Sequence, residues 1–230
     1  MSKAENHLIQ LLPRRERARL LGVCEQVELV TAKVLCEPGN ATHHIYFPTS
    51  GFISLIGLNE GTPDLEIGMV GSEGMLGAQV ALGVPTAPLR ALVQGAGEAW
   101  RIGTAAFRRE LALSSALRRR VDRYIYVLMA QMATSTTCPR FHLIGQRLAR
   151  CLLMSQDRAR ADSFRVTQEL LAYRLGVRRV GITAAAGILQ SNGLIEYRRG
   201  DLTVRNRKGL EAASCSCYAA DKQAYAEQLH

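Results

Sequence analysis

Residues 166–204 constrain the fold of this chain more than any other segment. Thr167 is suited to cap a helix N-terminus, and Glu169 follows in the first turn, where the helix dipole favours a carboxylate. The apolar stripe of this first helix consists of Leu170, Leu171 and Leu175, and Gly176 ends it. A second stripe at helical spacing begins at once, with Ile182, Ala186 and Leu189. Two helices joined by a short glycine-bearing turn form a helix-turn-helix.

A β-hairpin is predicted directly after these helices. The runs LIEY and LTV flank Arg198-Arg199-Gly200-Asp201, a sequence suited to a tight turn. Together the two helices and the hairpin predict a winged helix-turn-helix, a DNA-binding module. The alternative is an ordinary helix pair and hairpin with no nucleic-acid role.

Charge separates this part of the chain from the rest. The whole chain carries a net charge of +9, and residues 138–208 hold 14 Arg and Lys against 5 Asp and Glu. Residues 24–107 hold 3 basic and 8 acidic residues. Such segregation favours a phosphate-backbone binder, and the expected partner is double-stranded DNA. No basic amphipathic helix with an aromatic apolar face supports membrane binding.

Length and composition indicate two modest domains in 230 residues. The charged run Pro13-Arg14-Arg15-Glu16-Arg17 interrupts any secretory signal, and no stretch approaches the length of a membrane span. We therefore expect a cytoplasmic protein whose six cysteines are reduced.

The N-terminal half predicts an antiparallel β-roll after a helical lead-in at 5–26. Six short apolar runs between residues 27 and 102 alternate with glycine and proline: VELV, HIYF, FISLIGL, LEIGMV, RALVQ and EAWRI. A long helix is expected from 104 to 137, broken by Cys138-Pro139, with another helix at 141–156. The predicted fold class is α+β.

The long helix carries a modest heptad pattern. Its predicted seam consists of Leu117, Val121, Tyr124 and Leu128. One interpretation is a dimer interface. The other is a single amphipathic helix packed on the roll.

Three stretches carry a resemblance to a known family. They are Tyr46-Phe47-Pro48 with Gly51, the loop from Gly68 to Gly77, and Gly176-Val177-Arg178-Arg179 through Gly193-Leu194-Ile195. With them the chain resembles the cyclic-AMP receptor protein/Fnr superfamily of bacterial transcription regulators over its whole length. The resemblance implies a homodimer formed along the long helix, a ligand in the roll, recognition helices in successive major grooves and RNA polymerase as a partner. The expected domains are a sensor roll at 1–105, a dimerisation helix at 106–137 and the winged helix at 138–230.

The effector site departs from the family pattern. Cyclic-nucleotide-binding members use a Glu for the ribose and an Arg-Ser or Arg-Thr pair for the phosphate. Glu73, next to Gly74, matches the first position, but Ala87-Pro88 stands at the second. A buried phosphate needs a fixed cation and hydrogen-bond donors. Arg90 is a candidate substitute or a solvent-facing residue. We expect a small-molecule effector, a nucleotide or another molecule but not cyclic AMP in the usual pose, or none.

The cysteines and histidines form no complete metal-binding motif in the sequence. The family's iron–sulfur branch needs a cysteine cluster, and the N-terminal half offers Cys24 and Cys36 alone. Cys138 and Cys151 are predicted to be core residues. Cys215 and Cys217 form a Cys-x-Cys that could chelate or be redox-active, or be incidental in a frayed tail. The pair His43-His44 points to opposite faces of a strand, and His7, His142 and His230 are not near in sequence.

The sequence contains no nucleophile-elbow, phosphate-loop or HExxH motif. We therefore do not expect an enzyme. The alternative function is a ligand-binding or redox-sensing protein whose basic domain is an interaction surface.

In the recognition helix, spanning 178–192, the resemblance carries over one residue at a time. Arg179 matches a guanine-binding arginine of the family, whereas Val180 and Ala184 replace a Glu and an Arg. The further residues predicted to contact DNA are Arg178 and Thr183, with Thr167 and Gln168 at the start of the first helix, and Arg165, Arg198 and Arg199 on phosphates.

Overall fold

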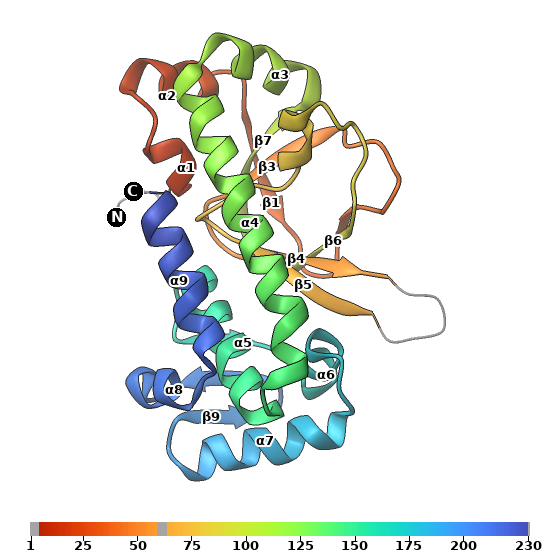
Figure 1. The fold of residues 1–230 in the computed structure, drawn as a ribbon, viewed down its shortest axis with the longest axis vertical. Coiled ribbons are helices and arrows are strands. Elements are labelled where there is room, and N and C mark those ends of the chain that lie inside the picture. Colours follow the sequence, from red (N-terminus) through yellow and green to blue (C-terminus); the bar gives the residue numbers. More distant parts are fainter. Residues whose placement is uncertain (1–4, 59–63, 230) are drawn as a thin grey trace.

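The computed structural model describes residues 5–58 and 64–229. The N-terminal part is a roll of antiparallel strands (Figure 1). Its strands are β1 Glu25–Leu29, β2 Val34–Cys36, β3 His44–Pro48, β4 Phe52–Gly57, β5 Leu65–Val70, β6 Arg90–Gly95 and β7 Gly97–Gly103. All except β2 coincide with the predicted apolar runs. The predicted turn residues Gly61, Thr62 and Pro63, together with His230, lie outside the described residues.

The strands form two sheets, ordered β1-β7-β3 and β2-β6-β4-β5. Successive side chains of a strand point to opposite faces, and β4 has buried side chains on both of its faces. Ile53 and Leu55 enter the core of the roll, whereas Phe52 joins the core of the C-terminal domain. The outer face of this sheet therefore packs against the C-terminal domain.

The predicted helix at 104–137 is two helices, α3 Thr104–Leu113 and α4 Ser115–Phe141. Ser114 separates them, with an extended backbone (φ −129°, ψ 100°) and a hydroxyl that accepts a 2.9 Å hydrogen bond from the amide of Leu117. The predicted break at Cys138-Pro139 is also wrong. Proline removes one amide donor, yet the helix continues to Phe141, where the amide of His142 bonds to the carbonyl of Cys138 at 3.0 Å.

The apolar seam of α4 packs inside the protomer. Val121 and Tyr124 have no exposed surface, and Leu117 is also buried. Their predicted role in a dimer interface is therefore wrong, and the alternative of an amphipathic helix packed on the roll is confirmed for these three. Leu128 is half-buried in the same packing. Gly74 permits this close approach, because a Cβ there would lie 2.3 Å from the Tyr124 ring.

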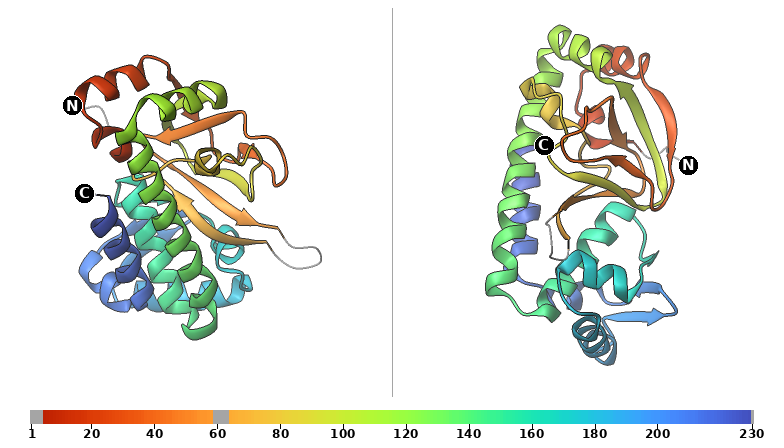
Figure 2. Two further views of the ribbon diagram at one scale, coloured as in Figure 1. Left: turned by 45° about the horizontal axis from the view of Figure 1, so that its top comes forward. Right: turned by 90° about the vertical axis from the view of Figure 1, so that its right-hand side faces the viewer.

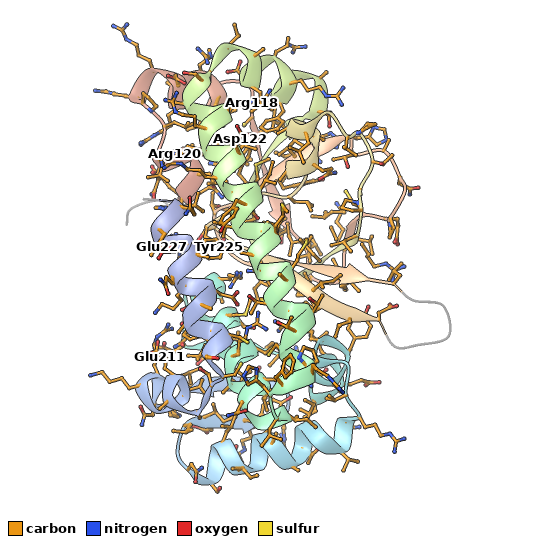
Figure 3. The ribbon with its side chains drawn as sticks, in the orientation of Figure 1. Arg118, Arg120, Asp122, Glu211, Tyr225 and Glu227 are labelled. Atoms are coloured by element: carbon orange, nitrogen blue, oxygen red, sulfur yellow. The ribbon has the colours of Figure 1, made fainter. Side chains whose placement is uncertain are left out.

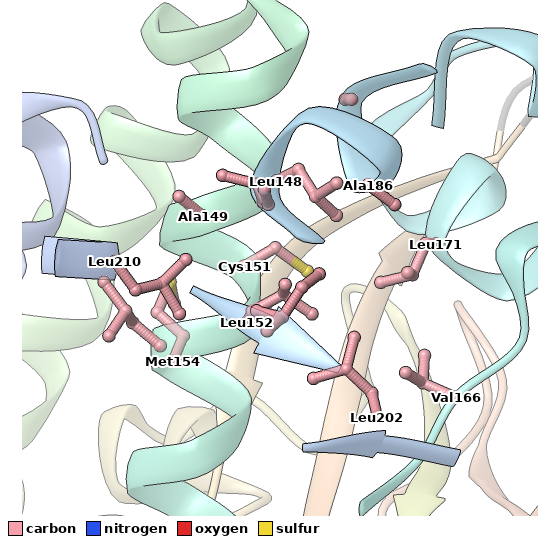
Figure 4. Packing of buried hydrophobic residues seen from close by; sticks show 14 of the residues in the cluster. Leu148, Ala149, Cys151, Leu152, Met154, Val166, Leu171, Ala186, Leu202 and Leu210 are labelled. Atoms are coloured by element: carbon pink, nitrogen blue, oxygen red, sulfur yellow. The ribbon is translucent and has the colours of Figure 1, made fainter. Parts of the chain in front are cut away.

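The N-terminal lead-in forms two short helices, α1 His7–Gln10 and α2 Arg14–Leu21, and the 3₁₀ helix η1 Ala78–Leu82 lies in the roll. The C-terminal domain contains α5 Ile144–Ala159, β8 Ser163–Arg165, α6 Gln168–Leu175, α7 Arg179–Ser191, β9 Ile195–Arg198, β10 Asp201–Val204 and α8 Arg207–Ala213. Its core gathers around α5, where Leu148, Leu152, Leu171 and Leu202 meet (Figure 4). Cys151 is buried in this core, as predicted. The α+β fold class is confirmed.

The chain ends in a long helix, α9 Ser216–Gln228, which lies beside α4 (Figure 1). Tyr225 of α9 lies toward α4 (Figure 3), where its hydroxyl accepts a 3.4 Å hydrogen bond from the Gln131 amide. At its far end, the carbonyl of Leu229 is 2.7 Å from Nε2 of His7. The prediction of a frayed tail is therefore wrong. Among the described residues, no helix is long and apolar enough to cross a membrane.

Candidate nucleic-acid interface

The α6–α7 hairpin has the boundaries that the sequence predicts. The Thr167 hydroxyl accepts a 3.1 Å hydrogen bond from the amide of Leu170 and so caps α6. Gly176 ends α6 in the left-handed conformation (φ 61°), which costs glycine little. The chain reverses within this short turn, and α7 begins at Arg179.

Helix α7 has one buried and one exposed face. Ile182, Ala186 and Leu189 pack into the domain core, as predicted. The residues of this helix that were predicted to contact DNA all face solvent: Arg178, Arg179, Val180, Thr183 and Ala184. Val180 is 79% exposed, although it is a large apolar residue. The helix lies at one end of the molecule (Figure 1), so this face is accessible over its length.

Two arginines stand at the N-terminus of α7. Arg178 occupies the N-cap position with an extended backbone, and Arg179 is the first helical residue. The unsatisfied amides of a helix N-terminus carry a partial positive charge that attracts anions. The guanidinium groups add to that charge, so the start of α7 favours a phosphate or an electron-rich base edge.

A hydrogen bond joins the starts of the two helices. The Thr183 hydroxyl lies 2.6 Å from Oε1 of Gln168. Gln168 is half-buried, whereas Thr167 and Thr183 are exposed. The structure thus brings together Gln168 and Thr183, which the sequence analysis predicted independently as DNA contacts.

The hairpin is built on a two-residue turn. Arg199 and Gly200 both have positive φ, 52° and 91°, as a type I′ turn between twisted strands requires. Strand β8 adds a third, unpredicted strand, so that the sheet order is β8-β10-β9. Arg165, Arg198 and Arg199 are exposed on it. The wing lies close to α7, since the amide of Tyr197 on β9 donates a 2.8 Å hydrogen bond to Oε1 of Gln190 on α7.

Other basic residues of this domain bind the roll instead. Arg174 of α6 is 3.0 Å from Glu66 on β5, and both side chains are buried. Arg158 of α5 is 2.9 Å from Glu73. The Tyr173 hydroxyl donates a 2.9 Å hydrogen bond to Asp64, and burial with this bond raises the pKa of Tyr173 to about 12. Part of the charge segregation therefore serves contacts between the domains.

The three residues predicted to bind an effector have separate partners. The Glu73 carboxylate pairs with Arg158 and accepts a 3.1 Å hydrogen bond from the Gly71 amide. Arg90 pairs with Glu37 at 2.9 Å. Gly74 packs against Tyr124. Each residue thus has a packing or ion-pair role within the protomer.

A different cavity, of about 170 Å³, lies between the roll and α4. Its lining is almost wholly apolar and includes Leu55, Val70, Met75, Pro88, Leu128 and Met132, with Gln79 and Cys36 as the polar side chains. None of the described residues that line it is charged. Ala87 and Pro88, which the sequence analysis aligned with the phosphate-binding position, are both part of this lining.

Residues 146–213 match the model of the Crp-like helix-turn-helix domain. The fold is similar to that of FixK2 from Bradyrhizobium japonicum, with a TM-score of 0.71, 13% identity, and coverage of 84% of this chain and 98% of that one. It is also similar to a putative crp/fnr-family transcriptional regulator from Eubacterium rectale, with a TM-score of 0.66, 15% identity, and 91% and 99% coverage.

A third similar structure is the c-di-GMP-responsive global regulator CLP of Xanthomonas campestris, with a TM-score of 0.61, 18% identity, and 84% and 99% coverage. No curated protein matches the sequence. The chain therefore combines a Crp-like helix-turn-helix domain with the architecture of the CRP/FNR regulators: a β-rich domain, a long helix and a small wing sheet.

Proposed function

We propose that this protein is a homodimeric, sequence-specific transcription regulator that inserts α7 into the major groove of DNA. The observation that carries the proposal is the exposed face of α7, with Arg178 and Arg179 at its positive end and the wing arginines beside it. A helix presented in this way fits the width of the major groove.

The base contacts follow from the side chains on that face. Arg179 pairs bidentately with guanine, whereas Val180 and Ala184 offer apolar contact to a thymine methyl group. Arg165, Arg198 and Arg199 bind phosphates, which position the domain without selecting a sequence. The preferred half-site therefore differs from that of family members with Glu and Arg at positions 180 and 184.

In this proposal the dimer interface is the exposed face of α4 and not its buried seam. Tyr126 and Met129 are 59% and 64% exposed there, and exposed Ala133 continues the stripe at helical spacing. In the right-hand view of Figure 2, α4 forms one edge of the molecule. Pairing of two such edges places one α7 on each side of a twofold axis, as a palindromic DNA site requires.

The effector, in this proposal, is a small uncharged apolar molecule bound in the cavity between the roll and α4. The cavity wall includes Leu128 and Met132 of α4, so an occupant contacts the dimerisation helix directly. Its apolar lining disfavours cyclic AMP, because a buried phosphodiester needs a cation and none of the described lining residues is cationic. Recruitment or exclusion of RNA polymerase at the bound site is the regulatory output.

Selection of DNA sites from a random pool by the full-length protein tests this function. We expect enrichment of a twofold-symmetric site with guanine at the position facing Arg179. Retention of DNA at low salt without any enriched sequence would instead favour the alternative, in which the basic domain is a general interaction surface.

A further inference from the structure

Four potential metal ligands that are far apart in sequence meet where α4 ends and α9 begins. They are Cys138, His142, Cys215 and Cys217, and their ligand atoms all lie within 4.8 Å of one another. The Sγ atoms of Cys138 and Cys215 are 3.6 Å apart, and Sγ of Cys217 is 3.5 Å from Nδ1 of His142. Cys138 and Cys215 are buried, whereas the other two are half-buried.

These spacings fit the coordination sphere of one tetrahedral ion. With Zn–S bonds of about 2.3 Å and Zn–N bonds of about 2.0–2.1 Å, the edges of the tetrahedron are about 3.5–3.8 Å. The two contacts across the cluster have these lengths. Three cysteines and one histidine are a common ligand set of structural zinc sites. A polynuclear iron–sulfur cluster places its ligands on separate irons and hence farther apart.

Local structure holds each pair of ligands. Cys138 and His142 are four residues apart at the C-terminus of α4, so they lie on one side of its last turn. Cys215 is the N-cap residue of α9 and Cys217 lies in its first turn. Arg147 and Arg150 of α5 line the same pocket as Cys138, so two cationic side chains lie beside the cluster, where positive charge favours thiolates.

We propose that these four residues bind one zinc ion, which fastens the start of α9 to the end of α4. The segment between the ligand pairs, residues 143–214, contains the Crp-like helix-turn-helix domain. The ion therefore links the two ends of that domain. The rest of α9 is held by Arg150 and Asp221, at 2.7 Å, and by the contacts of Tyr225 and Leu229 with α4 and α1. The site does not depend on DNA binding.

Metal analysis of the full-length protein tests the proposal. Protein purified under reductant, loaded with Zn²⁺ and desalted should retain about one equivalent per chain. Replacement by Co²⁺ should give the visible bands of a tetrahedral ion with thiolate ligands. A chelator should lower the melting temperature, and Zn²⁺, but not Mg²⁺, should restore it.

A matched pair of variants locates the ion. Cys217→Ser should lose most of the bound zinc, whereas Cys36→Ser, at a half-buried cysteine of the roll, should keep it. Zinc-loaded wild-type protein that retains no stoichiometric metal would overturn the proposal, even if Cys217→Ser did not fold. Equal zinc content in the two variants would do the same, as would a Cys138–Cys215 disulfide in protein handled without oxygen.

Discussion

Arginine has two separate roles in the C-terminal domain. Arg174 is 1% exposed, pairs with Glu66, donates a 3.1 Å hydrogen bond to the Ser155 hydroxyl and lies over the Phe52 ring at 5.6 Å. Arg179 and Arg199, in contrast, are exposed. A residue count cannot separate these roles, because both kinds contribute equally to the net charge.

The Arg174–Glu66 pair should matter greatly for stability. Arg174→Met leaves the Glu66 carboxylate buried without its partner, which should reduce the free energy of unfolding by about 3–5 kcal/mol. The double variant Arg174→Met with Glu66→Leu should recover much of this loss, because no charge then remains buried. Urea unfolding of both variants measures the difference. Equal losses would show that the pair does not act as a unit.

Arg179 should determine sequence preference. A bidentate guanine contact contributes about 1–3 kcal/mol, so Arg179→Ala in a dimer should lower specific affinity by about 2–6 kcal/mol if the half-sites act independently. Arg199→Ala is the matched control, and it should weaken all DNA sequences alike while reducing the salt dependence by about one phosphate contact per subunit. Fluorescence anisotropy with the selected site and a scrambled duplex separates the two effects.

At the scale of elements, the sequence predicted best what depends on local periodicity. Strands β1 and β3–β7 and the α6–α7 hairpin follow from apolar spacing and turn residues. The break at Ser114 was missed because its flanking residues are good helix formers on both sides. The buried seam of α4 was assigned to a partner because an apolar stripe does not show what covers it.

The cysteine cluster shows a different limit. Cys138 and Cys215 lie 77 positions apart, and no local pattern brings them together. A signal was present in the spacing, because Cys-x₃-His on a helix and Cys-x-Cys both present two ligands to one ion. The sequence analysis assigned Cys138 to the core without pairing it with His142, and it placed Cys215 and Cys217 in a tail. Only the packing of α9 on α4 joins them.

The outer face of α4 should form the dimer. Met129→Glu places a carboxylate in the proposed interface and should give monomers, with weaker specific DNA binding because each protomer then occupies half a site alone. Leu113→Glu is the control, since Leu113 is 66% exposed on α3 and lies outside the stripe. Sedimentation velocity decides the matter. A Met129→Glu protein that remains dimeric would place the interface elsewhere.

The cavity between the roll and α4 should not accept cyclic AMP. Its described lining offers no cation for the phosphate, so calorimetric titration should show no saturable binding. Saturable binding in the micromolar range would contradict this assignment. Binding of an uncharged apolar molecule would support it.

At the scale of the whole molecule, the roll and the C-terminal domain pack directly against each other. Phe52 and Met69 of the roll pack among residues of the C-terminal domain, and the ion pairs of Arg158 and Arg174 lie at the same boundary. Helix α9 runs from the C-terminal domain to α1 of the N-terminal part. A change in the roll can therefore reach α7 through packed elements and without a flexible linker.

The ratio of specific to non-specific DNA affinity tests the central claim most directly. The full-length protein is titrated, at several salt concentrations, with the site obtained by selection and with a scrambled duplex of the same composition. The account predicts a preference for the selected site of about 10³-fold or more at physiological salt, and a loss of affinity for both duplexes as salt rises. Equal affinity for the two duplexes at every salt concentration would contradict sequence-specific binding through α7.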